Sequence, residues 1–339
     1  MRRRRGLLVA AVLLLTGCGG AAVDDAAPSG PPSIDLAEVA GADAGVLDVA
    51  ATDDGRSVVL LTPPGGPLTL ADVAADGSST AVPVPGLDAE RPGLTRIAAT
   101  GEGVVVVGFA AGRVALVPAG PQGAGAPQPV GTLGGADVAA LHVTAADGVL
   151  WLALTGIDGT DRLLAVDPAS GAVRAEVALP GTPRDLTTTG DGGVVVATDT
   201  GRAAAAVTVD GSGAVSEVPL GPGAAGPVTV AGGEVYATVG GSGEISIARG
   251  AEVLATVPGD LPAALVVDPA GEEVTLVDTV ADSEVPRVLQ RTVDLSAGEV
   301  TGEVELCDSG AVAGADVDDA GRGSVVSDCR GEPTLWRFG

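Results

Sequence analysis

Short apolar runs recur along the chain from Ile34 to its end, and glycine or proline interrupts every stretch long enough for a helix. Asp-Gly and Gly-Gly pairs bound many of these runs, and no 3.6-residue periodicity is sustained between them. Valine-rich segments separated by such turns are typical of β-strands. The pattern therefore predicts an all-β domain.

Several of these runs are apolar at consecutive positions rather than at alternate ones. Three examples are residues 104–107, 149–152 and 194–196. A strand with this pattern must be buried on both faces. In a chain without crossover helices, four-stranded sheets that stack radially on one another provide that burial, which predicts a β-propeller.

Glycines in the predicted inner hairpins recur at a nearly regular interval. They are Gly55, Gly103, Gly148, Gly192, Gly233, Gly271 and Gly321, spaced 38 to 50 residues apart. Propeller blades have periods of this length. We therefore predict seven four-stranded blades over residues 33–339. A six- or eight-bladed ring and a pair of β-sandwiches remain as alternatives.

A second hairpin follows each inner one, and its clearest copy is Leu164–Val173, with the sequence LAVDPASGAV. This strand-turn-strand segment resembles YVTN-type and quinoprotein-like (WD40-like) bacterial propellers, in which Asp-Pro-x-Ser/Thr-Gly recurs. Weaker echoes are found at residues 207–213 and 292–298. The resemblance implies the propeller architecture and carries no particular activity with it.

The last repeat ends at Phe338, one strand short of a complete blade. Near the start, Ser33–Val39 alternates polar and apolar residues, as an outer strand does. We expect this N-terminal segment to supply the missing strand and so remove an exposed sheet edge.

The N-terminus has the features of an export signal. Arg2–Arg5 precede an apolar stretch, Gly6–Leu15, which is too short to span a bilayer because a spanning helix needs roughly 20 residues. The ending Leu15-Thr16-Gly17-Cys18 resembles the bacterial lipobox. The resemblance implies a lipoprotein signal peptide at 1–17 and lipidation of Cys18, followed by a flexible linker at 18–32. A plain signal peptide with an unrelated cysteine is the alternative.

By this interpretation the chain is held on the extracytoplasmic face of the cell membrane by its N-terminal lipid. Removing the signal peptide takes away four arginines and no acids, so the net charge changes from −26 to −30. Such an acidic chain opposes binding to nucleic acid and to anionic lipid headgroups. We therefore expect no nucleic-acid partner.

With Cys18 lipidated, Cys307 and Cys329 form an even pair in an oxidising compartment, which favours a disulfide. Closing that loop stabilises the fold by about 3 kcal/mol in the chain-entropy model. Two thiolates without a nearby histidine fall short of a tetrahedral metal site.

His142 is the only histidine, and no motif places a nucleophile or a second base beside it. We interpret it as a polar residue on a blade strand. Streptogramin lyases are similar in outline, but their chemistry depends on a second histidine that this chain lacks, so their activity is not expected here.

Two other candidate sites also have simpler interpretations. Residues 316–321 partly match a calcium loop, but Ala320 and Ser327 stand where oxygen ligands belong, so we predict an acidic hairpin turn. The chain has only five aromatic residues, too few for a stacking platform, and Trp151 lies inside an apolar run typical of core.

We therefore predict no catalytic residue, metal ligand or cofactor. The favoured function is a non-enzymatic, protein-binding or scaffold module at the cell envelope, with an envelope protein as partner. The alternative is a lactonase-like hydrolase or small-ligand binder that uses loop carboxylates and a metal in the central channel.

Overall fold

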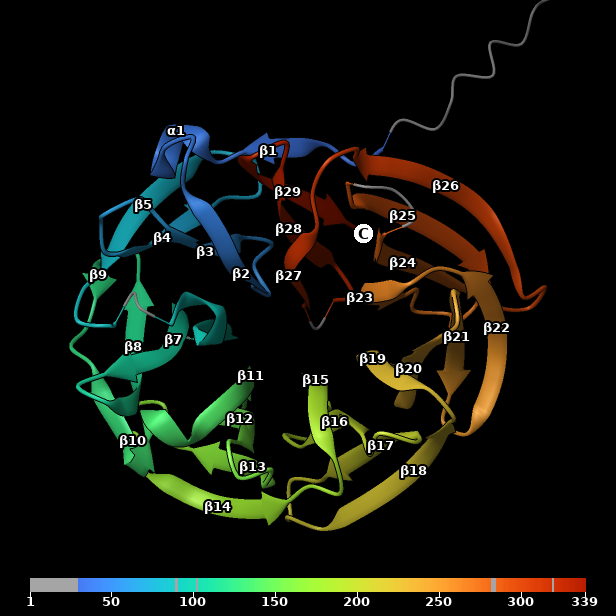
Figure 1. Cartoon of the computed structure of the whole chain (residues 1–339), viewed down its shortest axis with the longest axis horizontal. Helices are drawn as coiled ribbons and strands as arrows, with labels where there is room; N and C mark the ends of the chain where they lie inside the picture. Colours follow the sequence, from blue (N-terminus) through green and yellow to red (C-terminus); the bar gives the residue numbers. More distant parts are fainter. Residues whose placement is uncertain (1–29, 89–90, 102, 282–284, 319) are drawn as a thin grey trace, which may run out of the picture.

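The computed structural model describes residues 30–88, 91–101, 103–281, 285–318 and 320–339. Its strands form seven sheets arranged as blades around a common axis (Figure 1). Helical structure in the described residues is limited to α1 (Ala37–Ala40) and two short 3₁₀ turns at Pro92–Leu94 and Gly135–Asp137. The predicted all-β, seven-bladed propeller is confirmed, and the six-bladed, eight-bladed and sandwich alternatives are wrong.

The blades follow the chain in order, each beginning with the strand nearest the axis. Blade 1 contains β2 (Gly45–Ala51), β3 (Ser57–Thr62), β4 (Leu68–Val73) and β5 (Ser79–Val84). Blade 2 contains β6 (Arg96–Thr100), β7 (Gly103–Ala110), β8 (Arg113–Gly120) and β10 (Gln128–Gly134), and the short β9 (Gly123–Ala124) also pairs with β8. Blade 3 contains β11 (Val138–Ala146), β12 (Val149–Gly156), β13 (Asp161–Val166) and β14 (Val173–Ala178).

Blade 4 contains β15 (Thr182–Thr188), β16 (Val194–Asp199), β17 (Ala204–Val209) and β18 (Val215–Gly221). Blade 5 contains β19 (Ala224–Ala231), β20 (Glu234–Gly241), β21 (Glu244–Arg249) and β22 (Glu252–Pro258). Blade 6 contains β23 (Leu261–Val267), β24 (Glu273–Val280), β25 (Arg287–Asp294) and β26 (Glu299–Cys307). Blade 7 contains β27 (Val312–Val317), β28 (Gly323–Cys329), β29 (Glu332–Phe338) and β1 (Ser33–Asp35).

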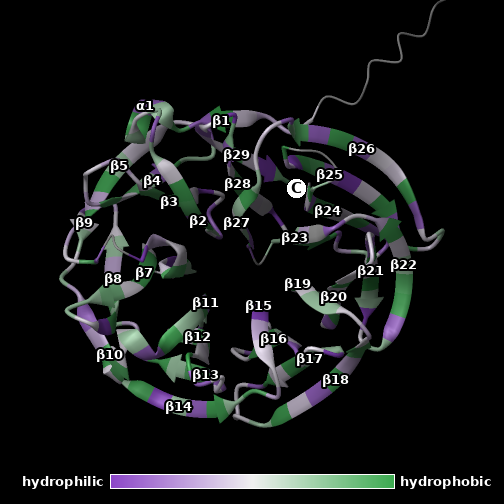
Figure 2. Ribbon diagram, viewed as in Figure 1, coloured by the Kyte–Doolittle hydropathy of each residue, from purple (hydrophilic) through white to green (hydrophobic). Residues whose placement is uncertain are grey.

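The core is divided into clusters of buried side chains that lie between neighbouring blades. On β7, Val104 and Val106 join the cluster shared with blade 1, whereas Val105 and Val107 join the cluster shared with blade 3. Because successive side chains of a strand point to opposite faces, a strand between two blades must be apolar at every position. This confirms the burial on both faces that the consecutive apolar runs predict. Figure 2 shows hydrophilic residues interspersed along the outer strands β14, β18 and β26, which have solvent on one side.

All seven glycines of the predicted repeat lie at the junction between the first two strands of a blade. Each has a positive φ, between 70° and 150°. Glycine adopts this backbone without the steric cost that a Cβ imposes. The interval between successive glycines along the sequence therefore corresponds to the length of one blade.

The N-terminal segment closes the ring as predicted, but its strand is shorter than predicted. β1 pairs antiparallel with β29, with Ile34 opposite Leu335. The predicted strand Ser33–Val39 is wrong beyond Asp35, because the chain turns there into α1. The Asp35 carboxylate accepts the N–H of Ala37, and Leu36 is completely buried against blades 1 and 7.

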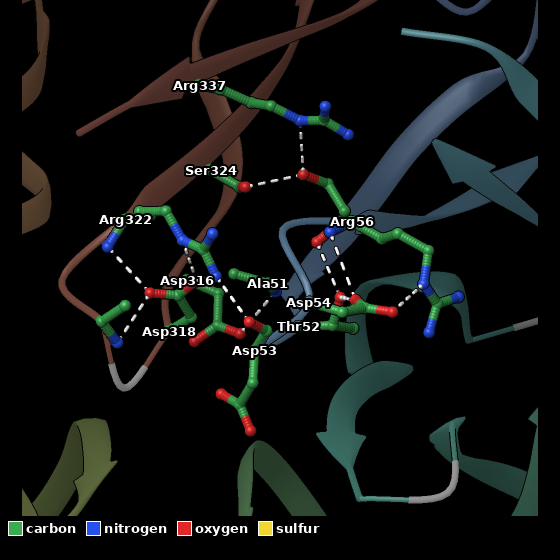
Figure 3. Close-up of polar contacts among 12 residues, drawn as sticks. Ala51, Thr52, Asp53, Asp54, Arg56, Asp316, Asp318, Arg322, Ser324 and Arg337 are labelled. Carbon is green, nitrogen blue, oxygen red and sulfur yellow. Dashed lines mark hydrogen bonds and ion pairs between the residues drawn. The ribbon is translucent and has the colours of Figure 1, made fainter. Parts of the chain in front are cut away.

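A network of polar contacts also joins blade 7 to blade 1 (Figure 3). The Ser57 and Ser324 hydroxyls lie 2.8 Å apart, and Arg337 donates Nε–H to Ser57 Oγ at 2.9 Å. Arg322 Nη2 donates to the backbone oxygen of Asp53 at 2.7 Å. These bonds fix the position of the last blade against the first.

The predicted disulfide between Cys307 and Cys329 is present. It bonds the outer strand of blade 6 to β28 of blade 7. Blade 7 is thus held covalently on one side and by β1 and the polar network on the other. Cys18, the predicted signal peptide and most of the predicted linker lie outside the described residues. In the described part of the chain, no helix is long and apolar enough to cross a membrane.

Candidate functional site

A cavity of about 960 Å³ follows the axis of the ring. Its walls are the innermost strands of the blades, and its mouth is formed by turns between first and second strands, including those at Asp53, Asp147 and Asp318. We call the side of the ring with this mouth the turn face and the opposite side the connection face. The connection face carries the chain segments that lead from one blade to the next.

The inner strands bring three carboxyl groups to the cavity wall. Asp48 lies on β2, Asp185 on β15 and Asp316 on β27. In β2 and β15 the pairing register shifts immediately before the aspartate. A bulge of this kind re-aims the side chain that follows it.

Each of these carboxyl groups bonds to the backbone of the next blade. Asp48 Oδ2 accepts the N–H of Ile97 at 3.0 Å, and Asp185 Oδ2 accepts the N–H of Val228 at 2.9 Å. Asp316 Oδ2 accepts the N–H of Ala51 at 2.9 Å, across the seam of the ring (Figure 3). The three aspartates therefore connect neighbouring blades while lining the cavity.

The surroundings of these three carboxyl groups raise their pKa values and so favour the protonated form. Burial raises the pKa of Asp48 to about 6, although Arg96 opposes the rise. Burial raises the pKa of Asp185 to about 7 and that of Asp316 to about 8, and repulsion from Asp48 adds to both. The backbone N–H bonds lower all three pKa values but do not offset the burial.

His142 lies on β11, as predicted, and lines the same cavity. Burial lowers its pKa to about 4, and the positive charges of Arg96 and Arg184 contribute. The imidazole is therefore neutral at pH 7. It has no hydrogen-bond partner among the described residues, and its wall position gives it no neighbouring Ser or Cys in the cavity lining that the structure describes.

The calcium-like segment behaves as an acidic hairpin turn, as predicted. Asp318 accepts the N–H groups of Ala320 and Arg322 and forms an ion pair with the Arg322 side chain. Asp316 takes no part in the turn, because it bonds to blade 1 instead. Within the described ranges, no group of three or more His, Cys, Asp or Glu side chains is placed to hold a metal ion.

Other aspartates lie in the hairpin turns of the turn face and accept backbone N–H groups of their own turns. They are Asp54, Asp76, Asp167, Asp191, Asp210, Asp268 and Asp294. These bonds favour the ionised carboxylate. Hydrogen bonds from Thr52 and Arg56 lower the pKa of Asp54 to about 2, and those from Arg174 and Ser170 do the same for Asp167.

The channel carboxyl groups were not singled out as a site by the sequence. From the sequence, Asp316 was a candidate only as part of a calcium-like loop, and Asp48 and Asp185 were not candidates. The available signal was a lone aspartate in an otherwise apolar first strand, as in Leu47-Asp48-Val49. Trp151, predicted as core, is 7% exposed and packs between blades 3 and 4.

No protein-family model matches the chain, and no curated protein matches its sequence. Solved structures match its fold. A catalytically inactive virginiamycin B lyase from Staphylococcus aureus, with quinupristin, is 15% identical with a TM-score of 0.61, and the match covers 91% of this chain and 99% of that chain.

Two further structures are similar over most of their length. YCF48 bound to D1 peptide is 15% identical with a TM-score of 0.55, covering 91% of this chain and 95% of that one. BamB from Moraxella catarrhalis is 14% identical with a TM-score of 0.51, covering 91% and 97%. At such identities the likeness shows the fold alone. The chain is a seven-bladed β-propeller.

Proposed function

We propose that this protein is a non-enzymatic binding module, anchored by a lipid on Cys18 outside the cytoplasmic membrane, which binds an envelope protein through its turn face. The observation that carries this proposal is the rigid presentation of charge on that face. Seven turn aspartates are fixed by bonds to their own backbone, on blades that are locked by β1, the disulfide and the seam contacts. A preorganised surface loses little conformational entropy on binding.

The charge of this face suits a basic partner. Fixed carboxylates, in a chain with a net charge of −26, attract positive patches and raise association rates at low salt. Among the structural neighbours, YCF48 is bound to a peptide and another belongs to a mitotic checkpoint complex. Lactonase-like structures are also neighbours, but the described carboxyl groups form no metal-binding cluster that would favour hydrolysis.

Membrane attachment is tested first. Cells that express the wild type and Cys18→Ala are labelled with radioactive fatty acid and fractionated. We expect label and membrane association for the wild type and neither for the variant. Label that persists in Cys18→Ala would rule out the lipid anchor.

Partner binding is then tested by co-purification from detergent-solubilised membranes. The variant Asp53→Asn/Asp147→Asn removes two exposed charges of the turn face. Its matched control, Asp43→Asn/Asp88→Asn, removes two exposed charges of the connection face. We expect the first variant alone to recover at least about threefold less partner, because long-range attraction is weakened. Equal recovery with both variants would show that the turn face is not the interface.

A further inference from the structure

Two carboxyl groups of the channel wall have no positive partner among the described residues. Neither Asp185 nor Asp316 forms an ion pair with an arginine of the described chain, and the main causes of their pKa shifts are burial, backbone N–H groups and other carboxyl groups. Both carboxyl groups are only partly exposed in the channel wall, and such a group without a counter-charge is unusual, because its ionised form loses part of its hydration.

The three arginines of the wall are engaged elsewhere, and Arg174 forms an ion pair with Asp167 at 2.5 Å. Arg96 lies close enough to Asp48 to lower the pKa of that carboxyl group, and its Nη1 donates to the backbone oxygen of Thr95 at 2.9 Å. Arg184 forms an ion pair with Asp199 at 3.2 Å. Asp48, Asp167 and Asp199 therefore account for all three positive charges, and Asp185 and Asp316 remain as carboxyl groups without a positive counterpart.

The wall also leaves space beside these groups. Blades 5 and 6 contribute only small side chains to it, namely Ala225, Gly226, Pro227, Pro262 and Ala263. At Gly226 an added Cβ would clash with Thr238 Oγ1, so the close packing of blade 5 keeps this sector free of a larger residue. The charged groups of the wall come instead from blades 1, 2, 3, 4 and 7.

We propose that the channel binds an organic cation, an ammonium or guanidinium group, for which Asp185 and Asp316 are the counter-charges. Each aspartate keeps one oxygen on the neighbouring blade and presents its carboxyl group to the cavity. The unpartnered imidazole of His142 offers a nitrogen lone pair to a further N–H donor of the ligand. The mouth favours entry of a cation, since the exposed carboxyl groups of Asp53 and Asp147 lie in its turns.

An ammonium or guanidinium group can come from two sources, a free small amine or a basic side chain of a partner protein. Binding of a cation from either source is a property beyond the proposed binding of a partner protein, because the purified chain by itself must bind the cation. Agmatine, which carries a guanidinium and an ammonium group, represents the first source. The peptide acetyl-Ala-Arg-Ala-amide represents the second.

The test is calorimetric titration of the full-length protein with each probe, and with citrate as an anion of opposite charge. The variants are Asp185→Asn and Asp316→Asn, which keep an oxygen to accept the N–H of the next blade. Asp210→Asn is the control, because it removes the same charge from the turn face outside the cavity.

We expect saturable binding of agmatine, of the peptide, or of both, and none of citrate. Each channel variant should weaken binding about tenfold, because a charge-assisted hydrogen bond is lost, and Asp210→Asn less than twofold. Binding of the peptide alone would assign the site to a partner's side chain, and binding of agmatine alone to a free amine. Failure of both probes, or equal losses in channel and control variants, would overturn the assignment while leaving turn-face binding to a protein untouched.

Discussion

Asp185 and Asp210 belong to the same blade, yet their carboxyl groups lie in opposite electrostatic settings. Asp210 sits in the turn between β17 and β18, where hydrogen bonds from Ser212 and Ala214 lower its pKa. Asp185 sits on β15 in the channel wall, where burial raises its pKa to about 7. The backbone N–H groups of Val228 and Leu186 do not offset the hydration that Asp185 has lost.

The same contrast extends around the ring and separates two uses of one residue type. On the turn face, the aspartate carboxylates accept hydrogen bonds from N–H groups of their own turns. These bonds fix the position of each carboxylate and stabilise its negative charge. In the channel, Asp185 and Asp316 have no positively charged ion-pair partner among the described residues. The first arrangement stabilises the blades, and the second costs stability unless a proton or a ligand cation is present.

The largest expected effect comes from removing a turn acceptor. Asp268 accepts N–H groups from Ala270, Glu272 and Glu273. We expect Asp268→Ala to lower the free energy of unfolding by about 2 kcal/mol, because these donors lose their acceptor. Urea denaturation measures the loss. Asp268→Asn, which keeps one acceptor oxygen, should lose less than half as much, and equal losses would contradict an acceptor role.

The channel should show the opposite sign. A carboxyl group with a raised pKa binds its proton more tightly in the folded than in the unfolded chain, so stability falls as pH rises between about 4 and about 8. We expect Asp185→Asn/Asp316→Asn to gain about 1 kcal/mol over the wild type at pH 8, and nothing at pH 4. Urea denaturation at the two pH values checks this. A variant that is less stable than the wild type at pH 8 would contradict the burial cost.

A smaller effect is expected on the acid side. Because the folded pKa values of Asp54 and Asp167 are lowered to about 2, their contribution is present above pH 4 and is lost as pH falls towards 2. Asp54→Asn/Asp167→Asn should therefore lose less stability than the wild type between pH 4 and pH 2.5. Thermal melting followed by circular dichroism measures the two slopes, and parallel slopes would show that other groups dominate.

The smallest effect is expected at His142. The imidazole is neutral and makes no hydrogen bond within the described structure, so His142→Gln should change the free energy of unfolding at pH 7 by less than about 0.5 kcal/mol. Its ring signals in a nuclear magnetic resonance titration of the wild type should stay in the neutral form down to about pH 5. Protonation with a midpoint near 6.5 would show that the channel wall is well hydrated, and would weaken the contrast with the turn face.

The repeat was predictable because its signals are local. Glycines with positive φ mark each first turn, and valines at consecutive positions mark strands between two blades. The disulfide and the closing strand followed from cysteine number and from the incomplete last repeat. The length of β1 did not follow, because the burial of Leu36 between blades 1 and 7, rather than the alternation along Ser33–Val39, decides where the strand ends. The export signal and lipidation at Cys18 remain predictions.

By itself, then, the sequence determined the architecture: short strands, the turn at the start of every blade and the number of blades. Only the tertiary structure decided the chemistry of the channel. Asp48, Asp185 and Asp316 are far apart in the chain, and no shared motif links them. Closing the ring turns all three towards one cavity, reduces their hydration and leaves Asp185 and Asp316 without an arginine as ion-pair partner in the described structure. Local pattern specifies a blade, but pKa values and counter-charges depend on groups that meet only when the blades surround a common axis.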